Sequence, residues 1–203
     1  MAKVGTVEAL RKIIGSPNQH VPLKIHQELN ARAIEFIGKS PIFMLATSDA
    51  AGRPTVSPKG DLPGFVQVED SRTLLIPERK GNKLIFSLTH ILDNPHVALI
   101  FLVPGTSETL RVQGTAELLD DADRRATLAA RGSPALLITR VTVTECYFHC
   151  AKAFLRSDLW KPETWPKKIA ISFGEEIAQS CGLQREAIAE FDRAVAERYK
   201  TDL

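Results

Sequence analysis

The sequence predicts a mainly β protein in which a six-stranded antiparallel barrel is surrounded by helices. Short apolar runs separated by turn residues fill residues 41–150, and helical periodicity is largely confined to the two ends of the chain. The 203 residues are 44% hydrophobic, which is enough apolar material for one sizeable core. We therefore expect a single domain over 1–203, with N-terminal helices at 1–40, the barrel at 41–150, and a loop and C-terminal helix at 151–203.

The charge balance and the apolar pattern argue against several classes of protein. The chain has 26 Lys and Arg against 24 Asp and Glu, an excess too small for a general nucleic-acid or membrane-surface binder. No apolar run is long enough to span a bilayer, and the first residues lack the apolar core of a signal peptide. Cys146, Cys150 and Cys181 form neither an even set nor a Cys-x-x-Cys pair, so we expect reduced thiols and a cytoplasmic location.

Two helices are expected before the barrel. Val7, Leu10, Ile13 and Ile14 form one apolar stripe at helical spacing, which ends at Gly15. A second stripe ends at Gly38 and contains Leu29, Ala33, Phe36 and Ile37. The link between the helices contains Pro17 and Pro22.

The first half of the barrel reads as two hairpins. Residues 42–47 lead through the turn 49–52 into the extended segment 54–59, and residues 65–68 lead through a polar turn to 73–76. A helical stretch over 83–92 follows, and Pro95 cannot continue it.

The second half of the barrel contains longer strands. Residues 97–103 are almost continuously apolar, which is typical of a strand buried on both faces. Residues 109–119 are interrupted by Gly114, which predicts a bulge. A short helix over 120–131 then separates them from the β-branched run at 136–150.

The tail reads as a basic, irregular loop over 152–168 followed by an amphipathic helix from Gln184. Ile188, Phe191, Val195 and Tyr199 give this helix an apolar side, which we expect to dock on the barrel or on a second subunit.

Two cation-bearing segments are the strongest candidates for a binding site. The segment 52–60 places Arg53, Ser57 and Lys59 on an extended run, which by itself fits a solvated hairpin edge equally well. The segment 78–83 adds three cations and a glycine at the expected start of a helix, where anions rather than cations are favoured. A bound phosphate would explain this cluster, and neither a P-loop nor a Gly-x-Gly-x-x-Gly fingerprint is present to suggest a nucleoside triphosphate or a dinucleotide.

Four segments in the same order resemble a known family. They are residues 42–61 (IFMLATSDAAGRPTVSPKGD), 76–82 (IPERKGN), 93–97 (DNPHV) and 108–114 (ETLRVQG). They are similar to the FMN-binding split barrels of the pyridoxamine 5′-phosphate oxidase-like superfamily, in particular an uncharacterised bacterial branch. The resemblance covers nearly the whole chain and implies a Greek-key split barrel that forms a homodimer with FMN between its subunits.

The resemblance also implies which residues meet the flavin. Arg53 and the segment with Val56, Ser57, Pro58 and Lys59 would line it, and Ile76 and Pro77 would border it. Arg79, Asn82 and Lys83 would hold its phosphate, and Thr109 and Arg111 would approach from the partner subunit. A cation near N1 and O2 of the flavin favours its reduced, anionic form, and Lys59, Arg53 and Arg111 are all candidates for that role.

A second constellation surrounds the end of the last strand. On a strand, Cys146, Phe148 and Cys150 face one side, whereas Tyr147 and His149 face the other. The opposed faces disfavour a zinc site, so packing cysteines are preferred and no metal is expected. In similar proteins this strand end approaches the flavin, which makes His149, Lys152 and Trp160 candidates for the substrate side.

The cation-bearing segments and the family resemblance favour an FMN-dependent oxidoreductase that acts on a small substrate or an electron carrier. Oxidation of pyridoxamine phosphate itself is disfavoured, because the true oxidases carry basic residues for the substrate in their last segment and this chain ends in an amphipathic helix. The alternatives are a flavin-binding sensor or storage protein without turnover, and a site for another cofactor such as a deazaflavin or haem.

Overall fold

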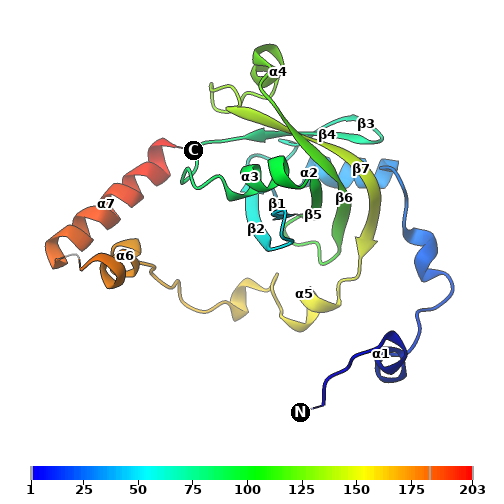
Figure 1. Cartoon of the computed structure of the whole chain (residues 1–203). Coiled ribbons are helices and arrows are strands. Elements are labelled where there is room, and N and C mark those ends of the chain that lie inside the picture. Colours follow the sequence, from blue (N-terminus) through cyan, green and yellow to red (C-terminus); the bar gives the residue numbers. More distant parts are fainter. Residues whose placement is uncertain (1, 183, 203) are drawn as a thin grey trace.

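A computed structural model describes residues 2–182 and 184–202 and contains one seven-stranded antiparallel sheet (Figure 1). The strands are β1 (Ile42–Ser48), β2 (Pro54–Gly60), β3 (Gln67–Asp70), β4 (Thr73–Glu78), β5 (His96–Leu102), β6 (Thr109–Leu119) and β7 (Leu137–His149). Their order in the sheet is β2-β1-β5-β6-β7-β4-β3. The expected antiparallel split barrel is confirmed, with a sheet of seven strands instead of six. Residues 1 and 203, the ends of the expected domain, lie outside the described residues.

The sheet curves around one core. Alternate residues of β1, β5 and β6 point inward, so Phe43, Leu45, Leu99, Phe101 and Leu110 are fully buried. β2 and β3 are the edge strands of this sheet, so the barrel is split rather than closed by a continuous ladder.

Burial on both faces, expected for residues 97–103, is wrong for β5 in this single chain. Val97, Leu99 and Phe101 are buried, whereas Ala98, Ile100 and Leu102 on the outward face are only half-buried. The buried run lies instead in β4, where all residues after Thr73 are buried. The apolar outward face of β5 is therefore only partly covered by the described residues.

Gly114 forms the bulge that the sequence predicts. The register between β6 and β7 shifts between Gln113 and Gly114, and a Cβ atom at Gly114 would overlap the carbonyl oxygen of Thr142. The missing side chain therefore lets the two longest strands approach closely while the sheet bends.

Helices surround the sheet. They are α1 (Val7–Ile14), α2 (Ala31–Lys39), α3 (Phe86–Asp93), α4 (Ala122–Thr127), α5 (Lys152–Arg156), α6 (Phe173–Cys181) and α7 (Arg185–Thr201), with short 3-10 turns at Val21–Lys24 and Pro162–Thr164. α2 buries Ala33 and Ile37 in the core, and α3 contacts β1, β2 and β6. No described helix has the length and apolar character that crossing a membrane would require.

Four helix expectations differ from the structure. The segment 152–168, expected to be an irregular loop, begins with α5. α3 begins at Phe86 rather than at residue 83, because Lys83 and Ile85 have left-handed backbone conformations with φ of 62° and 48°. α4 is shorter than the expected 120–131. α6 was not predicted at all, and it packs against α7 with the main chain of Gly174 close to Ile188.

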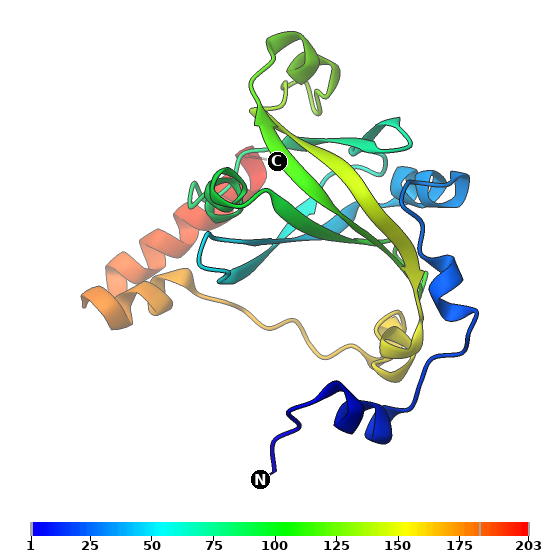
Figure 2. The ribbon, with the colours of Figure 1, turned by 45° about the vertical axis from the view of Figure 1, so that its right-hand side comes forward.

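Figures 1 and 2 show that α1, the segment between α5 and α6, and the α6–α7 pair lie apart from the sheet. The apolar side of α7 therefore packs on α6 rather than on the barrel. An ion pair between Lys80 and Asp202, with Nζ 3.7 Å from Oδ1, links the end of α7 to the barrel.

Candidate functional site

A pocket of about 510 Å³ opens where β2 and β4 come together. Its walls are residues 57–60 of β2, the end of β4, the loop 79–85 and the start of α3, with Phe65, Leu136 and Leu137 completing the lining. Pockets that bind small ligands have volumes of about 300–1,000 Å³. The pocket is therefore large enough for an organic cofactor.

A buried ion pair joins the two walls of this pocket. The Lys59 ammonium of β2 lies 2.5 Å from a carboxylate oxygen of Glu78 in β4, and the other oxygen accepts a 2.9 Å hydrogen bond from the Thr139 hydroxyl. The side chains of Lys59 and Glu78 are 19% and 8% exposed. Since β2 and β4 are not neighbours in the sheet, this pair holds the split side of the barrel together.

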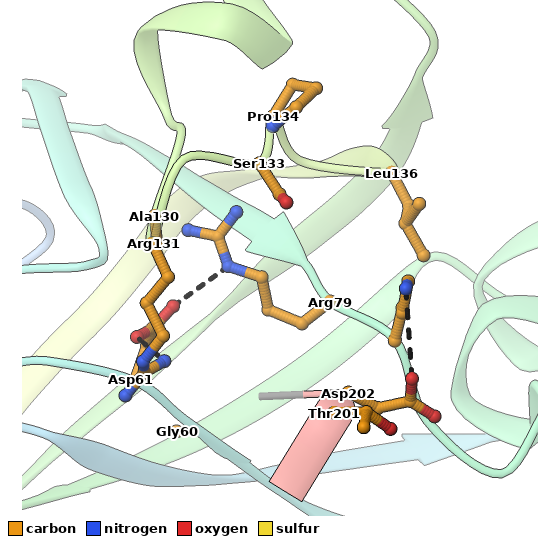
Figure 3. Close-up of a pocket in the computed structure, with 11 residues that line it drawn as sticks. Gly60, Asp61, Arg79, Ala130, Arg131, Ser133, Pro134, Leu136, Thr201 and Asp202 are labelled. Carbon is orange, nitrogen blue, oxygen red and sulfur yellow. Dashed lines mark hydrogen bonds and ion pairs between the residues drawn. The ribbon is translucent and has the colours of Figure 1, made fainter. Parts of the chain in front are cut away.

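The neighbouring cation, Arg79, is directed toward a smaller adjoining pocket of about 180 Å³ (Figure 3). Its Nε donates to Asp61 at 2.9 Å and its Nη2 donates to the Leu128 carbonyl at 2.8 Å. Arg131 also pairs with Asp61, at 3.0 Å. Two of the nitrogen atoms of Arg79 are thus engaged within the protein.

Asp61 is almost fully buried between these two arginines. Burial raises the pKa of its carboxyl, but the Leu62 N–H, the hydrogen bond from Arg79 and the charges of Arg79 and Arg131 outweigh burial and hold it below its ordinary value. The carboxylate is therefore ionised at neutral pH and ties the end of β2 to β4 and to the loop before β7.

The loop 79–85 has an unusual backbone at the pocket mouth. Lys83 and the β-branched Ile85 both adopt positive φ, a conformation that costs free energy in residues other than glycine. The Asn82 side chain accepts a hydrogen bond from the Leu84 N–H at 3.0 Å. Residues 80–86 are all exposed, and among the described residues Lys83 has no ion-pair partner.

A second cluster lies at the opposite end of β7. Arg111 of β6 donates to the Tyr147 hydroxyl at 3.5 Å, and the Lys24 ammonium lies 5.7 Å from the Tyr147 ring centroid. The Arg111 Nε is buried and has no hydrogen-bond partner among the described residues. Burial, followed by the charges of Arg111 and Lys24, lowers the pKa of His149, so its imidazole is neutral at pH 7.

The structure divides the expected site residues into two groups. The pocket is lined by Ser57, Pro58, Lys59, Pro77, Arg79, Asn82 and Lys83. Thr109, Arg111 and His149 share the far end of the sheet, where Thr109 is paired with His149. Tyr147 and Leu137 are ten residues apart on β7, which corresponds to about 33 Å of strand.

Other expected site residues line neither described pocket. Arg53 is 84% exposed on its side chain and pairs with Asp49 in the hairpin turn, and Val56 is exposed on the outward face. Ile76 is fully buried in the core. Lys152 begins α5, while Trp160 donates to the Thr106 carbonyl and stacks on Phe154.

The expectation of packing cysteines is confirmed for Cys146 but wrong for Cys150, which follows the end of β7 and is exposed. Cys146 is buried and its thiol donates to the Glu28 carbonyl, whereas Tyr147 and His149 lie on the other face with ring centroids 6.5 Å apart. Among the described residues, no group of three His, Cys, Asp or Glu side chains is placed to hold a metal ion.

Sequence reasoning missed Glu78, Asp61 and Tyr147. Glu78 and Asp61 stand inside or next to the cationic segments, and a lone carboxylate among cations was a usable signal for ion pairing. Tyr147 carried no comparable signal, because its neighbours Lys24 and Arg111 are distant in sequence.

Comparison with known proteins agrees with the geometry of the barrel. Residues 29–150 match the family described as pyridoxamine 5′-phosphate oxidase, which is more than half of the chain. The chain belongs to this family. No match was found among curated proteins.

Solved structures of this family's fold resemble part of the chain. A variant of HupZ from Group A Streptococcus is 20% identical with a TM-score of 0.50, over 60% of this chain and 99% of that chain. A candidate pyridoxamine 5′-phosphate oxidase from Lactobacillus delbrueckii is 27% identical with a TM-score of 0.46, over 60% and 95% of the two chains. An FMN-binding protein from Syntrophomonas wolfei is 11% identical with a TM-score of 0.44, over 58% and 81%.

Proposed function

We propose that this member of the pyridoxamine 5′-phosphate oxidase family binds FMN as a homodimer and works as an oxidoreductase on a small substrate or an electron carrier. The observation that carries the proposal is the 510 Å³ pocket, whose lining contains four cations, Lys59, Arg79, Lys80 and Lys83. The first three are paired with Glu78, Asp61 and Asp202, whereas Lys83 has no ion-pair partner among the described residues. An anionic phosphate attached to a large planar ring fits this combination of charge and volume.

The phosphate would be held by the loop 79–85. Lys83 and Lys80 supply charge at its exposed surface, and Asn82 shapes the backbone through its bond to the Leu84 N–H. Arg79 already donates to Asp61 and to the Leu128 carbonyl, so its first role is to position the loop. Its remaining N–H groups are the ones that could bind the phosphate.

The ring would lie against Ser57, Pro58 and Pro77, with Lys59 at its edge. FMN supplies reversible two-electron transfer when it is bound. Glu78 holds the Lys59 ammonium in a fixed place, so the protein presents an oriented dipole to the ring rather than a bare positive charge.

A second subunit would bring the other cluster to the cofactor. Thr109 and Arg111 of β6 and His149 of β7 line neither pocket of their own chain, and the buried Arg111 Nε has no hydrogen-bond partner among the described residues. The outward face beside Arg111 is apolar and contains Met44, Ile100, Leu102 and Val56, so it is suited to burial against a second copy.

The absorption spectrum of freshly purified protein tests the cofactor. We expect the two visible bands of bound FMN, and stoichiometric recovery of these bands when stripped protein is given FMN. A haem or deazaflavin spectrum, or failure to retain FMN, would refute the proposal. Reduction of the bound flavin by NADH or NADPH, followed by acceptor screening, tests the oxidoreductase role, and a flavin that no donor reduces would leave a sensor or storage protein.

A further inference from the structure

The single chain exposes far more surface than a compact protein of its size. Its accessible surface is 14104 Å². A folded monomer of 22.4 kDa should expose about 9,400 Å², which leaves an excess of about 4,700 Å². Obligate dimers bury about 2,000–5,000 Å² in total, so the excess is large enough to supply a permanent interface.

Two largely exposed arms contribute to this excess. The N-terminal arm is residues 2–25, all of which are exposed except Ala9, and it contains α1. The strap is residues 157–173, in which residues 161–171 are exposed without interruption. Both arms lie on the same side of the sheet and apart from it in Figures 1 and 2.

The N-terminal arm is built to be covered. Val7, Ile13 and Ile14 of α1 are 66–71% exposed, although they form one apolar stripe of an eight-residue helix. Isolated helices shorter than about 12 residues are marginal in water, so α1 needs a surface on which to pack. No described residue of its own chain provides that surface, because α1 buries no residue.

The strap has the same character. It exposes Trp165, Ile169, Ile171 and Phe173 with 55%, 74%, 66% and 43% of their surface accessible. The Trp165 N–H donates to the Leu159 carbonyl at 2.9 Å, which fixes the indole while its apolar surface remains uncovered. Four large apolar side chains exposed within nine residues are typical of an interface.

Both arms leave the barrel at the same place. His26, at the end of the N-terminal arm, pairs with Cys146 of β7 through two backbone hydrogen bonds of 2.9 and 2.7 Å. The strap begins just after α5, which follows the last residue of β7. Two arms that start together and extend on one side of the sheet can pack on either side of one partner domain.

We propose that the N-terminal arm and the strap are exchanged between two copies of this chain, each pair of arms packing on the barrel of the other copy. A second copy can cover both the arms and the barrel, because each barrel exposes Val56 and residues 84–86 at the pocket mouth and leaves Met44 and Ile100 half-buried. One symmetric contact then covers the arms and the faces together. The inference deepens the dimer of the proposed function but does not require bound FMN.

Sedimentation equilibrium of arm variants tests the exchange. The double variants Ile13→Gln with Ile14→Gln, and Trp165→Gln with Ile169→Gln, should each weaken the dimer at least tenfold. Their matched controls, Arg11→Gln with Lys12→Gln and Lys167→Gln with Lys168→Gln, should leave it within about twofold. Because the substituted apolar residues are exposed in the single chain, circular dichroism of the dissociated variants should retain the β-sheet spectrum.

A photo-crosslinking amino acid at position 13 or 169 identifies what the arms touch. Irradiation at low micromolar concentration should give a covalent dimer of the full chain, with crosslinked peptides from the barrel of the second copy. Crosslinks only within one chain, a dimer indifferent to the apolar variants, or a monomer would each overturn the exchange.

The same samples are measured with and without FMN. Intermolecular crosslinks in a protein that does not retain FMN would support arm exchange and refute the proposed cofactor. A flavin-loaded protein whose arms crosslink only to their own chain would support the proposed cofactor and refute arm exchange.

Discussion

The Lys59 ammonium and the Glu78 carboxylate form an ion pair across the split side of the barrel, with 2.5 Å between nitrogen and oxygen. The two residues lie on β2 and β4, which stand five places apart in the order of the sheet. The pair therefore has a structural role and also determines the charge that the pocket presents to a ligand.

A thermodynamic cycle on this pair should show strong coupling. Either Lys59→Met or Glu78→Gln leaves its partner poorly solvated, and each should lower the free energy of unfolding by about 3 kcal/mol. The double variant should lose clearly less than the sum of the two single losses. Urea unfolding of the four proteins measures the coupling, and additive losses would mean that the pair does not join the two strands.

The same variants should shift the reduction potential of bound FMN in opposite directions. Deleting the cation in Lys59→Met disfavours the anionic reduced flavin and should lower the potential by about 30–60 mV, whereas Glu78→Gln should raise it. Spectroelectrochemical titration gives both values. Arg53→Met is the control, because Arg53 is exposed and paired with Asp49. An equal shift of the potential in that variant would mean that Lys59 is not the cation next to the flavin.

Lys83 should distinguish FMN from riboflavin. Lys83→Ala removes a phosphate contact and should weaken FMN binding about tenfold to a hundredfold, while riboflavin affinity and the free energy of unfolding remain unchanged. Fluorescence titrations with the two flavins provide the comparison. Arg32→Ala, an exposed cation of α2 that lines neither pocket, serves as the control.

Arg79 should behave differently from Lys83. Its bonds to Asp61 and Leu128 support the fold, so Arg79→Ala should lower the free energy of unfolding by about 2 kcal/mol in addition to weakening FMN binding. Urea unfolding of the flavin-free variant measures this loss. Unchanged stability would show that Arg79 serves the ligand alone.

Asp61 should make the protein sensitive to acid. Its folded-state pKa lies below the ordinary aspartate value of about 3.9, so the stabilisation is present above that pH and is lost as the pH falls through the folded-state pKa. Asp61→Asn should be less stable at pH 7 and should lose less stability between pH 5 and 3. Urea unfolding across this range gives the slopes, with Asp120→Asn measuring the effect of deleting one exposed carboxylate.

His149 should titrate below the ordinary histidine range. Burial and the charges of Arg111 and Lys24 lower its pKa, so Arg111→Gln should raise the value measured by NMR. Arg140→Gln, a change on the same sheet beside Glu117, should leave the His149 pKa in place. An unchanged value in Arg111→Gln would place the guanidinium away from the imidazole.

The sequence by itself determined the barrel and one wall of the pocket. Alternating apolar residues in 42–47 and 109–119 predict the strands β1 and β6, and the glycine at position 114 predicts the bulge in β6. The motif segments 57–59 and 79–83 lie in one pocket because they flank strands whose ends must meet once the sheet curls.

Only the tertiary structure decided which charges are already engaged and where the site ends. Lys59 and Glu78 are 19 residues apart and Arg79 and Asp61 are 18 apart, so their pairing depends on the curl of the sheet and not on local spacing. The structure also shows that Arg111 and His149 lie toward the other end of β6 and β7 and line neither pocket of their own chain. Helical periodicity predicts α1 as a helix. The sequence does not show that its apolar stripe stays unburied by the described residues of its own chain, because burial is a property of the packed chain.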